Sequence, residues 1–193
     1  MDGVTVALHA LGADGRAQAA QSREPGVTGE IAVRAAHGKD RYDRLWLTER
    51  ASAHNPGWHR TGDVGHLDTE GRLWVEGRVG HVITTADGPL TPAGIEQRVQ
   101  GLSAVRLAAA VGVGPPGVQQ VVVVVEIDPP TPYVGLAPAG LAISVRGQAR
   151  VDVAAVLAVA ALPVDIRHNS KIDRTRVARW AADLLAGGRL RRL

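Results

Sequence analysis

The sequence of 193 residues contains no cysteine, which excludes disulfide bridges, thiolate catalysis and cysteine-ligated zinc sites. Aromatic residues are nearly as scarce, with four Trp, two Tyr and no Phe, so the core must be built from aliphatic side chains. No apolar run approaches the roughly 20 residues that span a bilayer. The amino terminus also lacks a basic start followed by an apolar block. We therefore expect a cytoplasmic protein with no transmembrane segment and no signal peptide.

Charge of one sign is not concentrated on any part of the chain except its end. The formal net charge is +3, acidic and basic residues alternate along most of the sequence, and only residues 189–192 form a basic cluster. Because no basic face with interleaved aromatic residues accompanies this tail, we expect no nucleic-acid partner. The seven histidines include no pair spaced four residues apart, and we expect no metal site within the chain.

Hydrophobic residues make up 45% of the sequence, which indicates a globular chain with a real core. In the first half, apolar and polar residues alternate as they do in half-buried strands. The predicted strands lie at 4–8, 29–35 and 58–78 (a hairpin turning at 68–71), followed by a short pair around 82–84 and 89–91 that turns at Asp87–Gly88. This part of the chain therefore predicts a β-rich portion.

The second half mixes helical and strand patterns. Thr91 followed by Pro92 predicts a helix start, and five consecutive valines at 121–125 predict a strand that is covered on both faces. The predicted elements are helices at 91–100, 142–150 and 173–186 and strands at 105–113, 118–127 and 153–159. The fold class is predicted to be α+β, with a small domain of mixed sheet and flanking helices after an all-β portion.

Three short segments carry polar groups suited to chemistry: Arg60-Thr61-Gly62-Asp63, Gly77-Arg78 and Ser170-Lys171-Ile172-Asp173-Arg174. Each alone has a simpler interpretation, as a turn carboxylate, a surface cation and a solvated lysine before a helix. In this order and spacing they resemble the later core motifs of the adenylate-forming superfamily, and residues 29–31 (Gly-Glu-Ile) resemble an earlier one. The resemblance covers roughly residues 26–186.

This resemblance implies a carboxyl-terminal part of an ATP-dependent, AMP-forming carboxylate ligase. Residues 1–77 would be the last β-rich portion of the large AMP-binding domain and residues 79–193 the small mobile lid, with the hinge at Val79–Gly80. Asp63 would bind the ribose hydroxyls of ATP and Arg78 would lie beside the ribose or the α-phosphate. Lys171 would be the catalytic lysine, neutralising charge where the carboxylate attacks the α-phosphorus.

Within the superfamily, residues 81–96 and 163–174 look most like the fatty-acyl AMP ligases of bacterial olefin biosynthesis, the β-lactone synthetases. These adenylate a 2-alkyl-3-hydroxy fatty acid, whose own hydroxyl then displaces AMP. The clearest likeness is the run 165–169 before Ser170-Lys171. His81 and His168 could serve as bases for that hydroxyl, although a loop histidine that fixes backbone is the simpler interpretation of His168.

Three departures qualify the resemblance. Gly80 stands where relatives carry an acidic residue or lysine, and a glycine can still act as a hinge. In thioester-forming relatives, a loop with a lysine and a glycine lines the thiol tunnel. Residues 84–88 have no lysine and carry the glycine at a shifted position, which favours lactone closure. A phosphate loop and an adenine-binding segment are absent from the sequence. We therefore expect that a separate or preceding body binds ATP and supplies most of the Mg²⁺ ligands.

The alternatives that remain open are a fragment of a fatty-acyl-CoA synthetase and a truncated lid kept as a non-catalytic binding module. We expect the isolated chain to be inactive unless the AMP-binding body is supplied by the same or another polypeptide.

Overall fold

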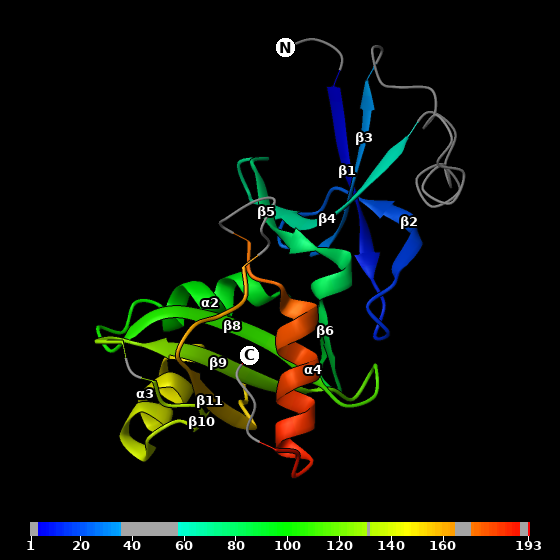
Figure 1. Cartoon of the computed structure of the whole chain (residues 1–193). Coiled ribbons are helices and arrows are strands. Elements are labelled where there is room, and N and C mark those ends of the chain that lie inside the picture. Colours follow the sequence, from blue (N-terminus) through cyan, green and yellow to red (C-terminus); the bar gives the residue numbers. More distant parts are fainter. Residues whose placement is uncertain (1–3, 36–57, 131, 165–170, 190–192) are drawn as a thin grey trace. The chain divides into compact units, whose positions relative to one another are not determined.

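The computed structural model describes residues 4–35, 58–130, 132–164, 171–189 and 193. The chain forms two compact units, residues 1–80 and residues 81–193 (Figure 1). This division lies close to the predicted boundary at residues 77–79. The assignment of the units to a large-domain remnant and a lid stays a prediction.

The first unit is a five-stranded antiparallel sheet with the strand order β2–β1–β3–β4–β5. Its strands are β1 (Val4–Leu11), β2 (Ala17–Ser22), β3 (Gly29–Ala35), β4 (His59–Leu67) and β5 (Leu73–Arg78). The predicted hairpin of β4 and β5 is confirmed, with its turn held by hydrogen bonds between Asp68 and residues 70–72. Strand β2 was not predicted, because its sequence, AQAAQS, has no alternation of large apolar residues and its side chains are mostly exposed.

A 3₁₀ turn, η1 (Val79–His81), spans the boundary between the units, and the second unit continues with a short hairpin of β6 (Ile83–Thr85) and β7 (Gly88–Leu90). Because Thr85 pairs with Gly88, the turn lies at residues 86–87, one position before the predicted Asp87–Gly88. Gly88 is the first residue of β7 and has a φ of 120°, so the glycine is still needed for its backbone conformation.

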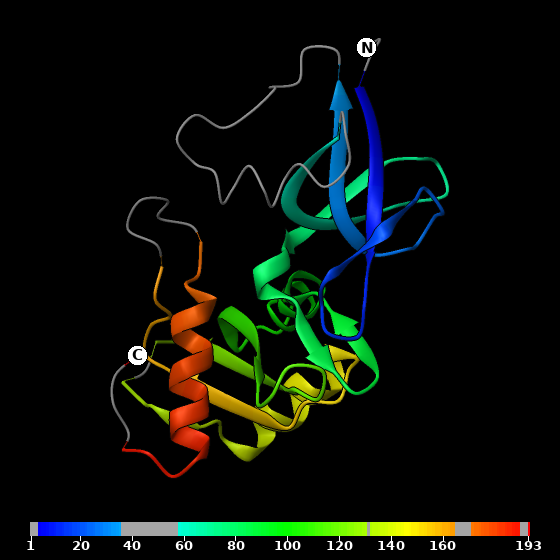
Figure 2. The same ribbon diagram turned by 90° about the vertical axis from the view of Figure 1, so that its right-hand side faces the viewer.

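A four-stranded mixed sheet with the order β10–β11–β9–β8 forms the centre of the second unit. Its strands are β8 (Val105–Val113), β9 (Gln120–Ile127), β10 (Gly135–Leu136) and β11 (Ala155–Val159). Helices α2 (Pro92–Val99) and α3 (Ala139–Ala149) pack on one face and α4 (Arg174–Leu185) on the other (Figure 1, Figure 2). All five valines at 121–125 are buried, with alternate members facing each layer, which confirms the prediction of a doubly covered strand.

The helices differ from the predictions mainly at their ends. Thr91 is the N-cap residue of α2, but its hydroxyl makes no capping hydrogen bond. Helix α3 begins at residue 139, three residues before the predicted start. Helix α4 is capped by the Asp173 side chain and buries Val177 and Ala181, whereas Leu185 at its end is exposed. None of the described helices is long and apolar enough to cross a membrane. The predicted α+β class is confirmed.

Candidate functional site

Asp63 and Arg78 lie side by side in the first unit. They are register partners across β4 and β5, and the Arg78 Nε is 3.0 Å from the Asp63 Oδ1. Arg78 also donates from Nη1 to the Thr61 carbonyl at 3.3 Å. Both side chains are accessible, with 37% of Asp63 and 57% of Arg78 exposed. The pair thus presents a carboxylate and a guanidinium together at the protein surface.

A buried carboxylate supports the loop that carries Asp63. Glu30 accepts hydrogen bonds from the Arg60 guanidinium, at 2.9 Å from Nε and also from Nη2, and from the Gly62 amide at 3.2 Å. Thr61 donates its hydroxyl to the Ile31 carbonyl and accepts from the Asp63 amide, both at 3.0 Å. Gly62 has a φ of 75°, a backbone conformation that is unfavourable for a residue with a side chain. The backbone around Asp63 is therefore held in place by hydrogen bonds to Glu30 and Ile31 of β3.

The predicted hinge residues, Val79 and Gly80, lie in η1 at the boundary of the two units. Gly80 does not have a positive φ, and an added Cβ would meet no atom within 4 Å. The residue at this junction that requires glycine is Gly77, with a φ of 137°. Gly80 is thus not needed by the backbone conformation seen here, and a hinge role would have to come from a second conformation.

Lys171 lies in the second unit, two residues before the N-cap of α4, and its side chain is exposed. The next residue, Ile172, is 8% exposed and forms an antiparallel bridge with Val164. The Asp173 amide donates to the Pro163 carbonyl at 2.8 Å. Residues 162–164 and 171–174 thus lie side by side and form a short stem, of which the first segment is the incoming arm and the second the outgoing arm. Lys171 is the first residue of the outgoing arm. The predicted neighbours Arg167, His168, Asn169 and Ser170 lie outside the described residues.

The altered loop at residues 84–88 is held against the β8–β9 connection. Thr84 is 5% exposed, its amide donates to the Gln119 Oε1 at 2.8 Å, and its hydroxyl accepts from the Gly117 amide at 2.8 Å. A threonine at this position is therefore a structural residue within the second unit, fully engaged by its own neighbours.

The sequence placed Glu30, Arg60 and Arg174 within the motif segments but gave them no role. Their support of these side chains, and that of Glu96, was not predicted. Sequence reasoning also missed one available signal, since lysine occurs only at positions 39 and 171 and arginine supplies every other basic residue. Because arginine and lysine differ in shape and hydration, a lysine at position 171 in a chain rich in arginine points to a specific role for that side chain.

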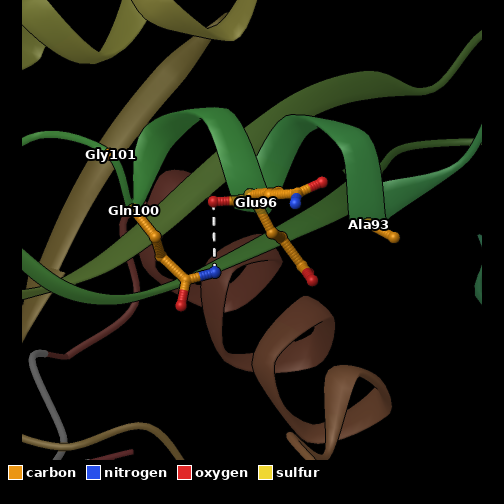
Figure 3. Close-up of a pocket in the computed structure, with 5 residues that line it drawn as sticks. Ala93, Glu96, Gln100 and Gly101 are labelled. Carbon is orange, nitrogen blue, oxygen red and sulfur yellow. Dashed lines mark hydrogen bonds between the residues drawn. The ribbon is translucent and has the colours of Figure 1, made fainter.

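Two further features bear on ligand binding. A shallow, open pocket of about 480 Å³ lies along α2, lined by Ala93, Glu96, Gln97, Gln100 and Gly101 (Figure 3), and it contains none of the predicted site residues. Among the described residues there is no group of three or more His, Cys, Asp or Glu that could hold a metal ion. The expectation of Mg²⁺ ligands outside this chain therefore stays a prediction.

Comparison with known proteins gives consistent relatives, although no family model matches the sequence. Olefin beta-lactone synthetases from Xanthomonas campestris and Stenotrophomonas maltophilia are 44% and 39% identical over 127 and 132 residues, each match covering 64% of this chain. An indoleacetate–CoA ligase from Aromatoleum aromaticum is 45% identical over 75 residues, 38% of the chain. The chain spans only 23% of the length of the two synthetases and 14% of that ligase.

The fold has close counterparts among solved structures. ATP-bound MatB from Rhodopseudomonas palustris superimposes with a TM-score of 0.75 at 20% sequence identity, covering 95% of this chain and 35% of MatB. At this identity the likeness establishes the fold. Both units of the chain are included in the match, since the coverage is nearly complete.

Proposed function

We propose that this chain, which belongs to the adenylate-forming superfamily and corresponds to its carboxyl-terminal part, supplies the nucleotide-side carboxylate and the lysine-bearing lid of an AMP-forming acid ligase. The observation that carries the proposal is the pairing of Asp63 with Arg78 on adjacent strands. The proposal also draws on the relatives, which are acid-activating synthetases and ligases.

Asp63 would bind the ribose of ATP. An ionised carboxylate accepts several hydrogen bonds, which suits two neighbouring hydroxyls. The Arg78 Nε lies 3.0 Å from one carboxylate oxygen, Oδ1, and would hold the carboxylate in a fixed orientation. The remaining donors of the guanidinium suit phosphate oxygens. We expect this pair to contribute to ATP affinity more than to the rate of the chemical step, because its contacts are made before the reaction begins.

Lys171 would contribute to the rate. Its exposed ammonium would lie beside the carboxylate oxygen and the α-phosphate, where negative charge is redistributed as acyl-AMP forms and pyrophosphate leaves. Positioned charges of this kind typically contribute about 3–4 kcal/mol to transition-state stabilisation, or a factor of about 100–1,000 in rate. ATP would be the cosubstrate, as it is the bound nucleotide in the MatB structure.

The product we favour is a β-lactone. The carboxylate of a 3-hydroxy fatty acid would attack ATP to give acyl-AMP and pyrophosphate, and the substrate hydroxyl would then close the ring, releasing AMP and a proton. The identity to two olefin beta-lactone synthetases supports this product. The engagement of Thr84 by Gln119 and Gly117 also supports it, because the loop offers no lysine toward a thiol acceptor.

The test is a chimera in which this chain replaces the aligned segment of the Xanthomonas campestris synthetase. It is assayed for pyrophosphate, AMP and lactone with a 2-alkyl-3-hydroxy fatty acid and ATP, with and without CoA. We expect lactone without CoA. Lys171→Ala should lower pyrophosphate release by about 100-fold or more with little change in the KM for ATP, whereas Asp63→Ala should mainly raise that KM.

Matched controls make the outcome decisive. Lys39→Ala removes the other lysine of the chain and should leave the rate unchanged. Pyrophosphate release that is unaffected by Lys171→Ala would refute the catalytic role, and a strict CoA requirement would replace the lactone product with a thioester. A folded chimera that binds ATP but never releases pyrophosphate would favour a non-catalytic lid.

A further inference from the structure

The stem that carries Lys171 is tied to the body of the second unit by a buried carboxylate, Glu96. This residue belongs to α2, and its side chain is 7% exposed. Figure 3 shows the Glu96 side chain leaving α2 on the side where the ribbon of α4 passes. A charge placed so far from solvent is costly unless it is paired and hydrogen-bonded, so its partners define its role.

Three donors meet the Glu96 carboxylate. The Arg174 guanidinium donates from Nε to Oε1 at 2.8 Å and from Nη2 to Oε2 at 2.5 Å, a bidentate contact. The Ala110 amide also donates to Oε1, at 3.0 Å. Arg174 is the first residue of α4 and stands three positions after Lys171. The same carboxylate thus binds the residue that ends the outgoing arm of the stem.

The geometry of the sheet explains why Glu96 can reach both groups. Strand β8 is the last strand in the order β10–β11–β9–β8, so the Ala110 amide points out of an open sheet edge. Helix α2 covers one face of the sheet and α4 the other. Glu96 therefore lies at the edge where the two layers meet, and the Arg174 guanidinium reaches it around that edge.

A second buried carboxylate holds the incoming arm. Glu126, in β9, is 3% exposed, and its Oε1 accepts the Leu162 amide at 2.5 Å. Its Oε2 lies against the Arg106 guanidinium. Leu162 precedes Pro163 and Val164, which pair with residues of the outgoing arm. Each arm of the stem is thus fixed by its own glutamate, and neither glutamate is near enough in sequence to serve as a local turn residue.

We propose that Arg174, held by Glu96, is a positioning residue for Lys171: the bidentate pair fixes the outgoing arm of the stem so that the lysine is presented in one orientation. This rests on the function proposed for Lys171. A bidentate fork sets direction as well as distance, which a single contact cannot do. Catalysis by a positioned charge depends on that direction, because small displacements of a reacting group lower rates steeply.

The structural part of the proposal is tested on the chain itself. Selective ¹⁵N-lysine labelling gives backbone signals from positions 39 and 171 alone. In Arg174→Gln we expect increased motion at Lys171 in the lysine-labelled sample. In a uniformly ¹⁵N-labelled sample we expect exchange of the Asp173 amide faster by about tenfold or more, as expected for loss of a charged hydrogen bond. Arg179→Gln, the same change at an exposed position of α4, should leave both unchanged. Arg174→Lys keeps the charge but loses the fork, and should give an intermediate effect in a folded chain.

The functional part is tested in the chimera by a cycle with Lys171→Ala. If Arg174 acts through the lysine, Arg174→Gln lowers kcat at unchanged KM in the wild type and has no further effect once Lys171 is alanine. Independent, multiplying losses would show that Arg174 only stabilises the fold and would overturn the proposal, as would unchanged motion at Lys171. If Lys171→Ala left the rate unchanged, the proposed function of Lys171 would be refuted. The ¹⁵N-lysine measurement would still decide whether Arg174 fixes the orientation of Lys171.

Discussion

The loop that presents Asp63 should depend on the buried charge beneath it. Glu30 has a side chain that is 7% exposed, and its partner Arg60 is 16% exposed. The change Glu30→Gln keeps the shape of the side chain and one acceptor oxygen, but it removes the negative charge that faces Arg60. The amide nitrogen that replaces one oxygen would then meet the donors of Arg60 or Gly62.

The magnitude follows from two opposing contributions. Removing one partner of a buried ion pair costs about 3–5 kcal/mol. The remaining amide oxygen can still accept one hydrogen bond, which recovers about 1 kcal/mol. We therefore expect the first unit to lose about 3 kcal/mol of its free energy of unfolding, equivalent to a decrease of about 1–3 M in the urea midpoint for typical slopes.

Hydrogen exchange read peptide by peptide at increasing urea follows the two units separately, so the loss should appear in residues 4–35 and 58–80 of the first unit and not in residues 81–189. The matched control is Glu70→Gln. Glu70 is 65% exposed and pairs with Arg72 at 2.6 Å, so its change should alter stability by less than about 0.5 kcal/mol. Equal midpoints for Glu30→Gln and wild type would refute the view that Glu30 braces the Asp63 loop.

Two further predictions concern the hairpin and the junction. Hydrogen bonds from the Trp74 indole and from Arg72 lower the pKa of Asp68 well below its usual range. Its stabilising effect is therefore present above the ordinary aspartate pKa of about 4 and is lost as the pH falls through the folded-state value. Asp68→Asn should therefore make the stability of unit 1 depend less steeply on pH than in the wild type, measured by exchange between pH 5 and pH 2. At the junction, Gly77→Ala should lower the free energy of unfolding by about 1–3 kcal/mol, because its φ of 137° disfavours a side chain, whereas Gly80→Ala should be neutral in unfolding experiments. If Gly80 is nevertheless the hinge, Gly80→Ala should slow turnover of the chimera, and an unchanged kcat would place the hinge elsewhere.

Much of the fold could be predicted because its signals are local. The turn at Asp68 and the alternation on either side of it set the register of β4 and β5 next to the turn. Beyond it, the register shifts by one residue between Val64 and Gly65, and this shift places Asp63 opposite Arg78. The run of valines at 121–125 indicated a strand covered on both faces for the same reason, since every side chain in it had to be buried. Strand β2 escaped prediction because its pairing with β1 is not accompanied by an apolar pattern.

The supporting residues could not be predicted, because their partners are distant in sequence. Glu30 and Arg60 are 30 positions apart, and Glu96 and Arg174 are 78 apart. Nothing in the composition near Glu96 distinguishes it from a solvated glutamate on the exposed side of α2. Its burial depends on the path of β8 and on the position of α4, both of which are set by the packing of the whole unit.

The doubly covered strand β9 has a consequence for how the second unit fails. Five consecutive valines without a charge are the kind of segment that pairs readily with copies of itself once uncovered. In the folded unit α2 and α3 cover one face and α4 covers the other. The Glu96 carboxylate accepts a hydrogen bond from the outward-pointing Ala110 amide at the β8 edge. Loss of any of these covers would expose the valine run, so we expect unfolding of this unit to lead to self-association.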